Sequence, residues 1–228
     1  MYIYETHCHT ETSSRCSRFA PEKIVDFYVK NGYDGVFITD HFLNGNCVDA
    51  LRDPAMPYKD KIFGYAKGYE KVKELAGDKL RVFFGIEYSY AGTDILVYGW
   101  DKHDLASMPE IMQMSLRGFI NYANEKGALT VHAHPFREAG YIDHIRLYPE
   151  VTGVEVFNAM RDERTNRLAE VYCSEYNKIK FSGTDNHGIY IPEYIGGMGF
   201  TERVKDERDF IEKVLADKGV PMKVKTVF

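Results

Sequence analysis

Cysteine is scarce in this sequence of 228 residues, and long apolar runs are missing. The four cysteines match no zinc-knuckle or CxxC spacing, and a chain of this length needs no disulfide staples, which favours free thiols in a reducing cytoplasm. No run approaches the roughly 20 apolar residues of a membrane-spanning helix. The start of the chain has neither the basic residues nor the apolar stretch of a signal peptide. These absences predict a cytoplasmic protein with no membrane partner.

An excess of basic residues is also missing. With 29 Lys and Arg against 34 Asp and Glu, the formal net charge is −5 and the pI is ≈ 5.9. A long nucleic acid is therefore not an expected partner, although a small basic pocket is compatible with an acidic average. The hydrophobic content of 44% is that of an ordinary globular protein. At this length it predicts one domain over residues 1–228 with a sizeable core.

Short segments rich in β-forming residues alternate with amphipathic helical segments. The expected strands cover residues 1–6, 33–41, 80–87, 93–100, 128–135, 153–159, 179–187 and 221–227. The expected helices cover residues 21–32, 61–78, 110–126, 163–178 and 207–219, and residues 43–60 and 188–199 read as long loops. This alternation predicts an α/β protein with a largely parallel sheet. Seven or eight such strands fit a (β/α) barrel, with an open doubly wound sheet as the alternative.

Polar residues stand where these strands end. The groups are His7 with His9, Asp40 with His41, Glu87, His132 with His134, Glu155 with Asn158, and Asp185 with His187. The carboxyl ends of barrel strands converge on one mouth, where the active site is built. Because alternate residues of a strand share a face, His7 and His9 can reach the same ion while Cys8 points away. The two remaining histidines, His103 and His144, are expected at the surface.

This set of donors indicates a metal centre. Imidazole and carboxylate together suit Zn, Mn or Fe, and a carboxylate such as Glu87 can bridge two ions. Two metals about 3.5–4 Å apart can make hydroxide from water and stabilise an in-line phosphoryl displacement. The pattern therefore predicts a metal-dependent hydrolase.

Five motifs together resemble those of the PHP family, named for its polymerase and histidinol phosphatase members. They are "HCHT" at 7–10, "ITDH" at 38–41, "GIE" at 85–87, "HPFR" at 134–137 and "GTDNH" at 183–187, in the family's order. The resemblance implies a distorted (β/α)7 TIM-like barrel. It also implies a cluster of two or three divalent metal ions, usually Zn, Mn or Fe, and phosphoester hydrolysis.

The resemblance implies a set of ligands for each ion. The first ion would take His7, His9, Glu87 and Asp185. The second would share Glu87 and add His134 and an aspartate, for which Asp94 is preferred to Asp101 because it opens the strand that follows Glu87. The third would take His41, His187 and a residue shortly after the HxH motif.

At that last position the family usually has His or Asp, whereas this sequence has Arg15. A guanidinium cannot bind a cation. We therefore expect the third position to be weakly held or empty, unless Cys16 or a bound anion completes it, and Arg15 to bind the substrate phosphate. The alternative is that Arg15 points into solvent.

Four further residues receive roles at the mouth. Asp40 and His132 would orient the ligating imidazoles. Arg137 would clamp a phosphate through its guanidinium, with a surface ion pair as the alternative. The catalytic candidates are thus Asp40, Arg137 and Arg15. Glu155 is expected to form hydrogen bonds within the barrel.

The sequence thus predicts a metal-dependent phosphoesterase that acts on a small phosphorylated substrate, a phosphomonoester or a phosphodiester. A 3′–5′ exonuclease is one alternative and should have a basic groove near the mouth. An amidohydrolase-type enzyme is another, and a non-catalytic regulatory module, which should have lost ligands, is the last. Loops set specificity in barrels, and the loop sequences do not name the substrate.

Overall fold

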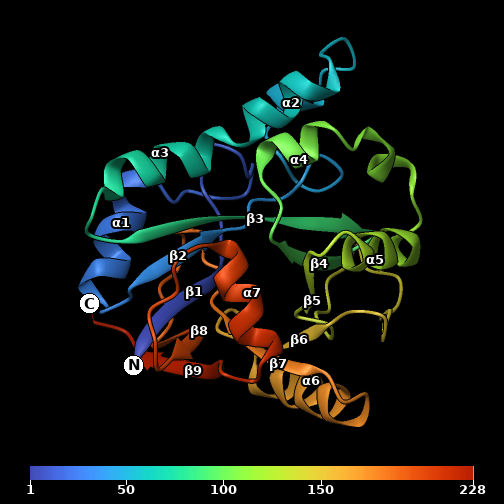
Figure 1. Ribbon diagram of the computed structural model, residues 1–228. Helices are drawn as coiled ribbons and strands as arrows, with labels where there is room; N and C mark the ends of the chain where they lie inside the picture. The colour runs from blue at the N-terminus through green and yellow to red at the C-terminus, as the bar shows by residue number, and fades with distance from the viewer. Residues whose placement is uncertain (228) are drawn as a thin grey trace.

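The computed structural model describes residues 1–227, and its strands form one curved sheet surrounded by helices (Figure 1). The strands are β1 (Tyr2–Cys8), β2 (Gly35–Ile38), β3 (Arg81–Tyr90), β4 (Thr93–Tyr98), β5 (Leu129–Ala133), β6 (Gly153–Asn158), β7 (Ile179–Gly183), β8 (Tyr194–Phe200) and β9 (Val220–Lys225). The α-helices are α1 (Pro21–Lys30), α2 (Tyr58–Tyr65), α3 (Lys67–Ala76), α4 (Lys102–Ala106), α5 (Leu116–Glu125), α6 (Glu163–Glu175) and α7 (Glu207–Leu215). Two 3₁₀ helices cover Asp49–Arg52 and Pro109–Gln113.

The strand order is β7-β6-β5-β4-β3-β2-β1-β8-β9. Parallel pairs join β1 to β2, β2 to β3, β5 to β6 and β6 to β7. A parallel bridge between Cys8 and Asn186 connects the end of β1 to the residues after β7. The sheet therefore curls into a nearly closed barrel, and the prediction of a distorted β/α barrel is confirmed rather than the open doubly wound sheet.

Strand β4 is antiparallel to both of its neighbours. Only Ala91 and Gly92 separate it from β3, with φ values of 49° and 83°. A two-residue loop with both φ angles positive is the connection that favours a hairpin over a crossover. Together with the antiparallel pairs of β8, this makes the sheet more mixed than the largely parallel sheet that the sequence predicted.

Two expected loops contain regular structure. The sequence predicts a loop over 188–199, but most of β8 lies in this segment, paired with β1 and β9. The segment 43–60 holds the first 3₁₀ helix and the start of α2. The expected helix over 61–78 is interrupted at Ala66, where α2 gives way to α3. Within residues 1–227, no helix combines the length and apolar character needed to cross a membrane.

An aromatic layer fills the barrel at the end where the parallel strands begin and the antiparallel β4 and β8 finish. Its members are Tyr4, Phe37, Phe83, Tyr98, Phe181, Phe200 and Phe210, all in one buried cluster. The ring of Phe210 on α7 lies 4.5 Å from that of Phe37, 5.6 Å from those of Tyr98 and Phe200, and 6.3 Å from that of Phe181. This packing leaves the opposite end of the barrel as the place for polar groups.

Candidate metal centre

The carboxylate of Glu87, on β3, is the centre of the site. Its Oε1 lies 3.2 Å from His7 Nε2 and 3.3 Å from His134 Nε2. Its Oε2 lies 3.7 Å from His9 Nε2 and also contacts His41 Nδ1. Four imidazoles from three different strand ends therefore meet one buried carboxylate, as the convergence of the predicted strands implied.

The residues expected to hold a first ion lie together. Asp185 Oδ1 is 3.5 Å from His7 Nε2 and 3.4 Å from His9 Nε2. Donor atoms of His7, His9 and Glu87 lie within 4.8 Å of one another, and so do those of His7, His134 and Asp185. Cys8 points into the core between the barrel and α1, as the alternation along β1 predicted.

The structure favours Asp94 over Asp101 for a second ion. Asp94 Oδ2 lies 3.9 Å from His134 Nε2, and Glu87, Asp94 and His134 form another compact donor group. Asp101 instead caps α4, where its side chain accepts hydrogen bonds from the backbone N–H groups of His103 and Asp104. The geometry thus gives Glu87 a place in two adjacent donor groups.

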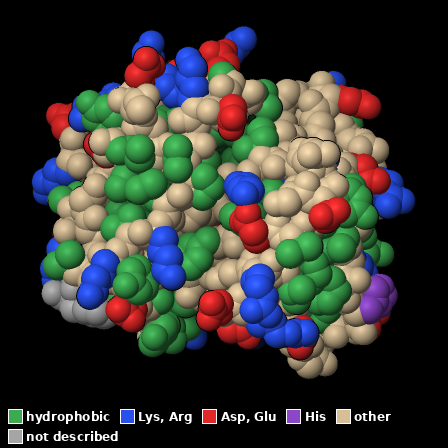
Figure 2. Space-filling view, turned by 90° about the horizontal axis from the view of Figure 1, so that it is seen from below, with side chains coloured by type: hydrophobic (Ala, Val, Ile, Leu, Met, Phe, Trp, Pro, Cys, Tyr) green, Lys and Arg blue, Asp and Glu red, His purple; other side chains and the backbone are tan. Residues whose placement is uncertain are grey.

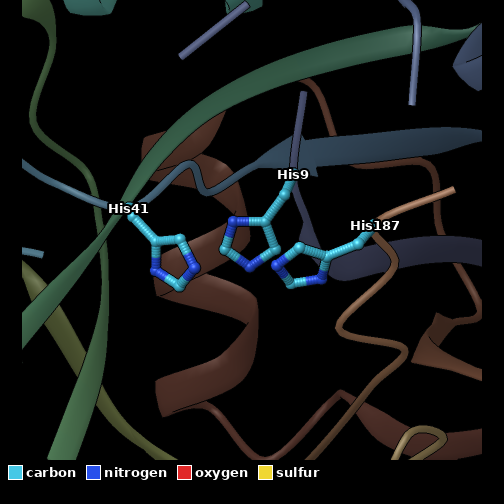
Figure 3. Close-up of side chains that lie close together, drawn as sticks. All are labelled: His9, His41 and His187. Carbon is cyan, nitrogen blue, oxygen red and sulfur yellow. The ribbon is translucent and has the colours of Figure 1, made fainter. Parts of the chain in front are cut away.

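A fourth donor group, at the position expected for a third ion, contains His9, His41 and His187 (Figure 3). The ring centroids of His9 and His187 are 4.2 Å apart, and those of His9 and His41 are 4.5 Å apart. Cys16 joins this group, since its Sγ lies 3.2 Å from His41 Nε2.

Arg15 lies outside the site, contrary to the prediction that it binds the substrate phosphate. Its guanidinium is 57% exposed and pairs with Asp49 at 3.1 Å. The backbone N–H of Arg15 donates to the carbonyl of Asn46, which turns the side chain away from the histidines. The loop after β1 therefore presents Cys16, not Arg15, to His41.

The donor atoms fit a bound cation. Among the described residues, His7 Nε2, His9 Nε2, His41 Nδ1 and both carboxylate oxygens of Glu87 are buried without a hydrogen-bond partner of good geometry. One such atom costs about 1–3 kcal/mol when nothing satisfies it. Unpaired buried atoms are few in native proteins, so their gathering at one point indicates a ligand that the chain itself does not supply.

Two carboxylates and one imidazole have the protonation states that metal binding needs. Burial would raise the pKa of Glu87 and of Asp185, but the neighbouring imidazoles, His41 for Glu87 and His7 for Asp185, outweigh it and hold both pKa values well below the usual range. Burial and the nearby His187 and His41 keep the pKa of His9 well below that of a free histidine. These carboxylates are therefore ionised, and His9 is neutral with a free lone pair. His7 and His41 differ: burial would lower their pKa values, but Glu155 and Glu87 outweigh it and raise them well above the usual range, so an ion must displace a proton from each.

Cys16 is the thiol most suited to metal binding in the part of the chain that is described. Burial would raise its pKa, but hydrogen bonds with His187 and His41 prevail and lower the pKa to about 6. The other three cysteines, Cys8, Cys47 and Cys173, are buried away from the histidines of the site. Thiolate, not thiol, is the form that binds metals.

Glu155 positions two of the ligands. Its Oε1 lies 2.9 Å from His7 Nδ1, and its Oε2 accepts hydrogen bonds from the backbone N–H of His134 and from Asn158 Nδ2. A carboxylate on the outer nitrogen fixes the orientation of a metal-binding imidazole and raises its basicity. Glu155 thus forms hydrogen bonds within the barrel, as predicted, and these bonds orient His7 and His134.

Asp40, expected as a catalytic residue, acts only through other residues. Its carboxylate accepts hydrogen bonds from the backbone and hydroxyl of Thr10 and from Ser14 Oγ. Ser14 Oγ in turn lies 3.2 Å from His9 Nδ1. Asp40 is 2% exposed, and burial raises its pKa to about 6. It is therefore a positioning residue, as the resemblance also implied, and Ser14 is the link that sequence reasoning missed.

His132 does not orient the ligands as expected. Its ring lies 6.2 Å from that of Tyr148 and 5.9 Å from that of Tyr172, on the side of the strand opposite to the site. Burial, followed by the nearby His134, lowers its pKa to about 3. Strand β5 ends at Ala133, and His134 has a positive φ of 28°, which breaks the alternation that would have placed both histidines on one face.

Two arginines line the mouth. Arg137 Nη2 donates to Asp94 Oδ2 at 2.9 Å, and Arg161 Nη2 donates to Asp185 Oδ2 at 3.2 Å. Both belong to a cavity of ≈ 570 Å³ that also holds His41, His134 and His187. The sequence analysis missed Arg161, although its position just after β6 matches the rule that functional residues follow strand ends.

The two histidines expected at the surface lie away from this site. His103 is an exposed residue of α4, with its ring 5.4 Å from that of Phe63. His144 is exposed and pairs with Asp143 at 3.0 Å.

Comparisons with known proteins agree with the motifs and the fold. Residues 5–178 match the model of the PHP domain, whereas a comparison with curated proteins finds no match. A two-domain protein of Bacteroides vulgatus, described as containing a predicted PHP-like metal-dependent phosphoesterase, aligns over 97% of this chain at 15% identity and a TM-score of 0.66. The chain spans 64% of that protein's length.

Two other solved structures share the fold. One is assigned as a metal-dependent phosphoesterase of Bifidobacterium adolescentis, with 14% identity, a TM-score of 0.57 and coverage of 93% of this chain and 95% of that one. The other is an amidohydrolase of Chromobacterium violaceum with bound sulfate, with 14% identity, a TM-score of 0.50 and coverage of 81% and 87%. At these identities the likeness shows the fold alone. The match to the domain model extends over most of the sequence, and this chain therefore belongs to the PHP domain family.

Proposed function

We propose that this protein is a metal-dependent phosphoesterase that hydrolyses a small phosphorylated substrate. The observation that carries the proposal is the Glu87 carboxylate, which four imidazole nitrogens approach while its oxygens lack hydrogen bonds of good geometry. A buried carboxylate shared between two donor groups is the arrangement that a pair of divalent ions requires.

Two sets of residues would hold these ions. His7, His9, Glu87 and Asp185 form one set, and Glu87, His134 and Asp94 supply the other. Divalent ions bound there would lower the pKa of water and neutralise negative charge on the phosphoryl oxygens. The donors suit Zn, Mn or Fe, which share a preference for imidazole and carboxylate ligands.

Arg137 and Arg161 would bind the phosphoryl group. Each uses one guanidinium nitrogen to hold a carboxylate of the site, and the Nε of each is buried without a partner among residues 1–227. Guanidinium groups bind phosphate oxygens through charge-assisted hydrogen bonds in a fixed geometry. The two arginines would thus orient the substrate and offset its charge.

The mouth suits a small substrate better than a nucleic-acid strand. Its volume of ≈ 570 Å³ lies within the range of small-molecule pockets. Basic side chains around it are neutralised by acidic partners, namely Arg15 by Asp49, Arg146 by Asp143 and Arg164 by Glu138. An exonuclease needs a basic groove to follow the backbone of a nucleic acid. On the separate face shown in Figure 2, Lys and Arg are likewise interspersed with Asp and Glu.

Amide hydrolysis is the second candidate, because an amidohydrolase shares this fold. The carboxylates and imidazoles of the site suit either reaction. The two arginines at the mouth favour an anionic substrate, which argues for the phosphoester.

A hydrolysis screen on protein reconstituted with Zn, Mn or Fe would separate these functions. We expect turnover of phosphomonoesters or short phosphodiesters, loss of turnover in Glu87→Gln, and one oxygen label in the released phosphate when the reaction runs in labelled water. Label in the alcohol product would indicate C–O cleavage. Amide turnover alone would identify an amidohydrolase, and metal binding with no turnover of any class would favour a regulatory module.

A further inference from the structure

The donor group of His9, His41 and His187 differs chemically from the other three. The thiol of Cys16 adjoins it at His41, whereas a carboxylate belongs to each of the others. We propose that Cys16 is a thiolate ligand and that, with His41 and His187, it forms a third cation site of mixed sulfur and nitrogen donors. This inference deepens the proposed function, on which it rests, because the site adjoins the proposed two-ion centre.

The backbone holds Cys16 in this position. The N–H of Arg18 donates to the carbonyl of His187 at 2.8 Å, and Ser17 Oγ donates to the same carbonyl at 3.2 Å. On the other side of the cysteine, the N–H of Arg15 donates to Asn46 at 2.9 Å. The backbone on both sides of Cys16 is therefore held by hydrogen bonds, one set of them to His187, and these bonds keep the thiol close to the histidines.

Buried imidazole nitrogens border this position. His9, which also belongs to the first ligand set, is fully buried, its Nε2 has no hydrogen-bond partner among the described residues, and its ring lies between those of His41 and His187 (Figure 3). His41 Nδ1 is likewise without a good partner and faces Glu87. The proposed site is thus continuous with the Glu87 carboxylate through His41, while its outer side opens on the cavity that Cys16 and His187 line.

The thiolate determines which metals this position prefers. Soft sulfur donors select Zn and other thiophilic ions, whereas carboxylate and water ligands suit Mn and Mg. We therefore expect the third position to bind Zn(II) or Co(II) well and Mn(II) poorly. In Cys16→Asp, a hard donor replaces the soft one, and this preference should shift towards Mn(II).

Cobalt substitution tests the ligand directly. Metal-free protein titrated with Co(II) should show a thiolate-to-cobalt charge-transfer band in the near ultraviolet. The band should vanish in Cys16→Ser and remain in Cys173→Ser, the control, because Cys173 is a buried thiol on α6. Loss of this ligand should weaken the third ion by at least about 100-fold, since even residues that only orient a ligand contribute 10–100-fold. A band that persists in Cys16→Ser, or cobalt binding by the unaltered chain without any band, overturns the proposal.

Alkylation of the unaltered protein is a second test of Cys16 as a ligand, and it does not require the serine variant to fold. Cys16 is the only partly exposed thiol among residues 1–227, so iodoacetamide should modify it first in the metal-free protein. Zn(II) should slow that modification by at least about tenfold, because a coordinated thiolate is no longer a free nucleophile. Equal rates with and without Zn(II) would reject Cys16 as a ligand.

The hydrolysis screen is a separate readout that distinguishes the two proposals. A cysteine-dependent cobalt band with no phosphoester turnover refutes the proposed function alone. Phosphoester turnover without the band refutes the cysteine site alone.

Discussion

The two ends of the barrel strands are built from opposite kinds of residue. On β3, Phe83 belongs to the aromatic layer and Glu87 to the metal centre. On β7, Phe181 is in the aromatic layer and Asp185 follows the strand into the centre. One end of each strand therefore buries apolar surface, which favours folding, while the other buries charges, which costs free energy unless a partner offsets it.

This contrast separates stability from function along a single strand. The rings of the aromatic layer pack against one another within the chain and need no ligand. The imidazole and carboxylate atoms of the centre are not, and they remain available to ions and substrate. Changes in the two layers should accordingly produce different defects, and four predictions test this.

The largest effect is expected for Glu87→Gln. Amidation removes the charge shared by two donor groups, so we expect kcat/KM to fall by roughly 10⁴-fold, which corresponds to about 5 kcal/mol. Metal analysis should find fewer than two ions per chain. The control on the same strand is Phe83→Leu, which should lower Tm but leave metal content unchanged. Near-normal activity of Glu87→Gln would show that Glu87 does not bridge.

Phe210→Ala should have the next largest effect, on stability alone. Because four rings surround Phe210, its truncation should lower the free energy of unfolding by about 3–5 kcal/mol, measured by denaturant titration. The ratio of metal to folded protein should not change. Arg208→Ala on the same helix is the control, since that side chain is 90% exposed and should shift stability by no more than about 0.5 kcal/mol. Metal loss in folded Phe210→Ala would mean that the two layers are coupled.

Arg137→Ala and Arg161→Ala should each produce a moderate loss of activity. Removing one charge-assisted hydrogen bond costs about 1.5–3 kcal/mol, so kcat/KM should fall by about 10–100-fold. Lysine at either position should restore little of it, because an ammonium lacks the guanidinium fork. Arg164→Ala, an exposed arginine paired with Glu138, is the control. If Arg137→Ala and Arg161→Ala match this control, the mouth does not bind phosphate through arginine.

The smallest effect is expected for Arg15→Ala. Its ion pair with Asp49 is exposed, and such pairs contribute about 0–1 kcal/mol. We therefore expect an unchanged kcat/KM and a barely altered Tm, which steady-state kinetics and thermal denaturation can measure. A tenfold loss of activity would instead restore the earlier expectation that Arg15 binds phosphate, and the loop would then have to rearrange when substrate binds.

The strand that sequence reasoning missed shows why some local patterns mislead. Residues 194–200 contain several glycines, which suggested a loop, yet they form β8. A Cβ at Gly196 would lie 2.3 Å from the carbonyl oxygen of Gly183, and one at Gly197 would lie 2.7 Å from that of Tyr4. These glycines permit close packing against β7 and β1, a requirement that arises only when the barrel closes.

The direction in which individual side chains point could not be predicted from the sequence either. In the loop after β1, the resemblance to the PHP family suggested Arg15 as the residue nearest His41, but backbone hydrogen bonds to Asn46 and His187 place Cys16 there instead. On β5, alternation suggested that His132 and His134 share a face, but the positive φ of His134 separates them.

Apart from β8, the sequence by itself determined the alternation of strands and helices, the polar residues at the ends of the predicted strands, and the residue types available for metal binding. Those properties follow from local spacing, because most of the polar residues of the site stand at the carboxyl ends of their strands; Asp94 reaches the site from the amino end of β4, which is antiparallel to its neighbours. Only the tertiary structure decided which donors meet at Glu87, that Asp94 rather than Asp101 joins them, and that Arg161 and Cys16 face the same cavity. These contacts join segments far apart in the chain, and their distances depend on how the sheet curves and closes.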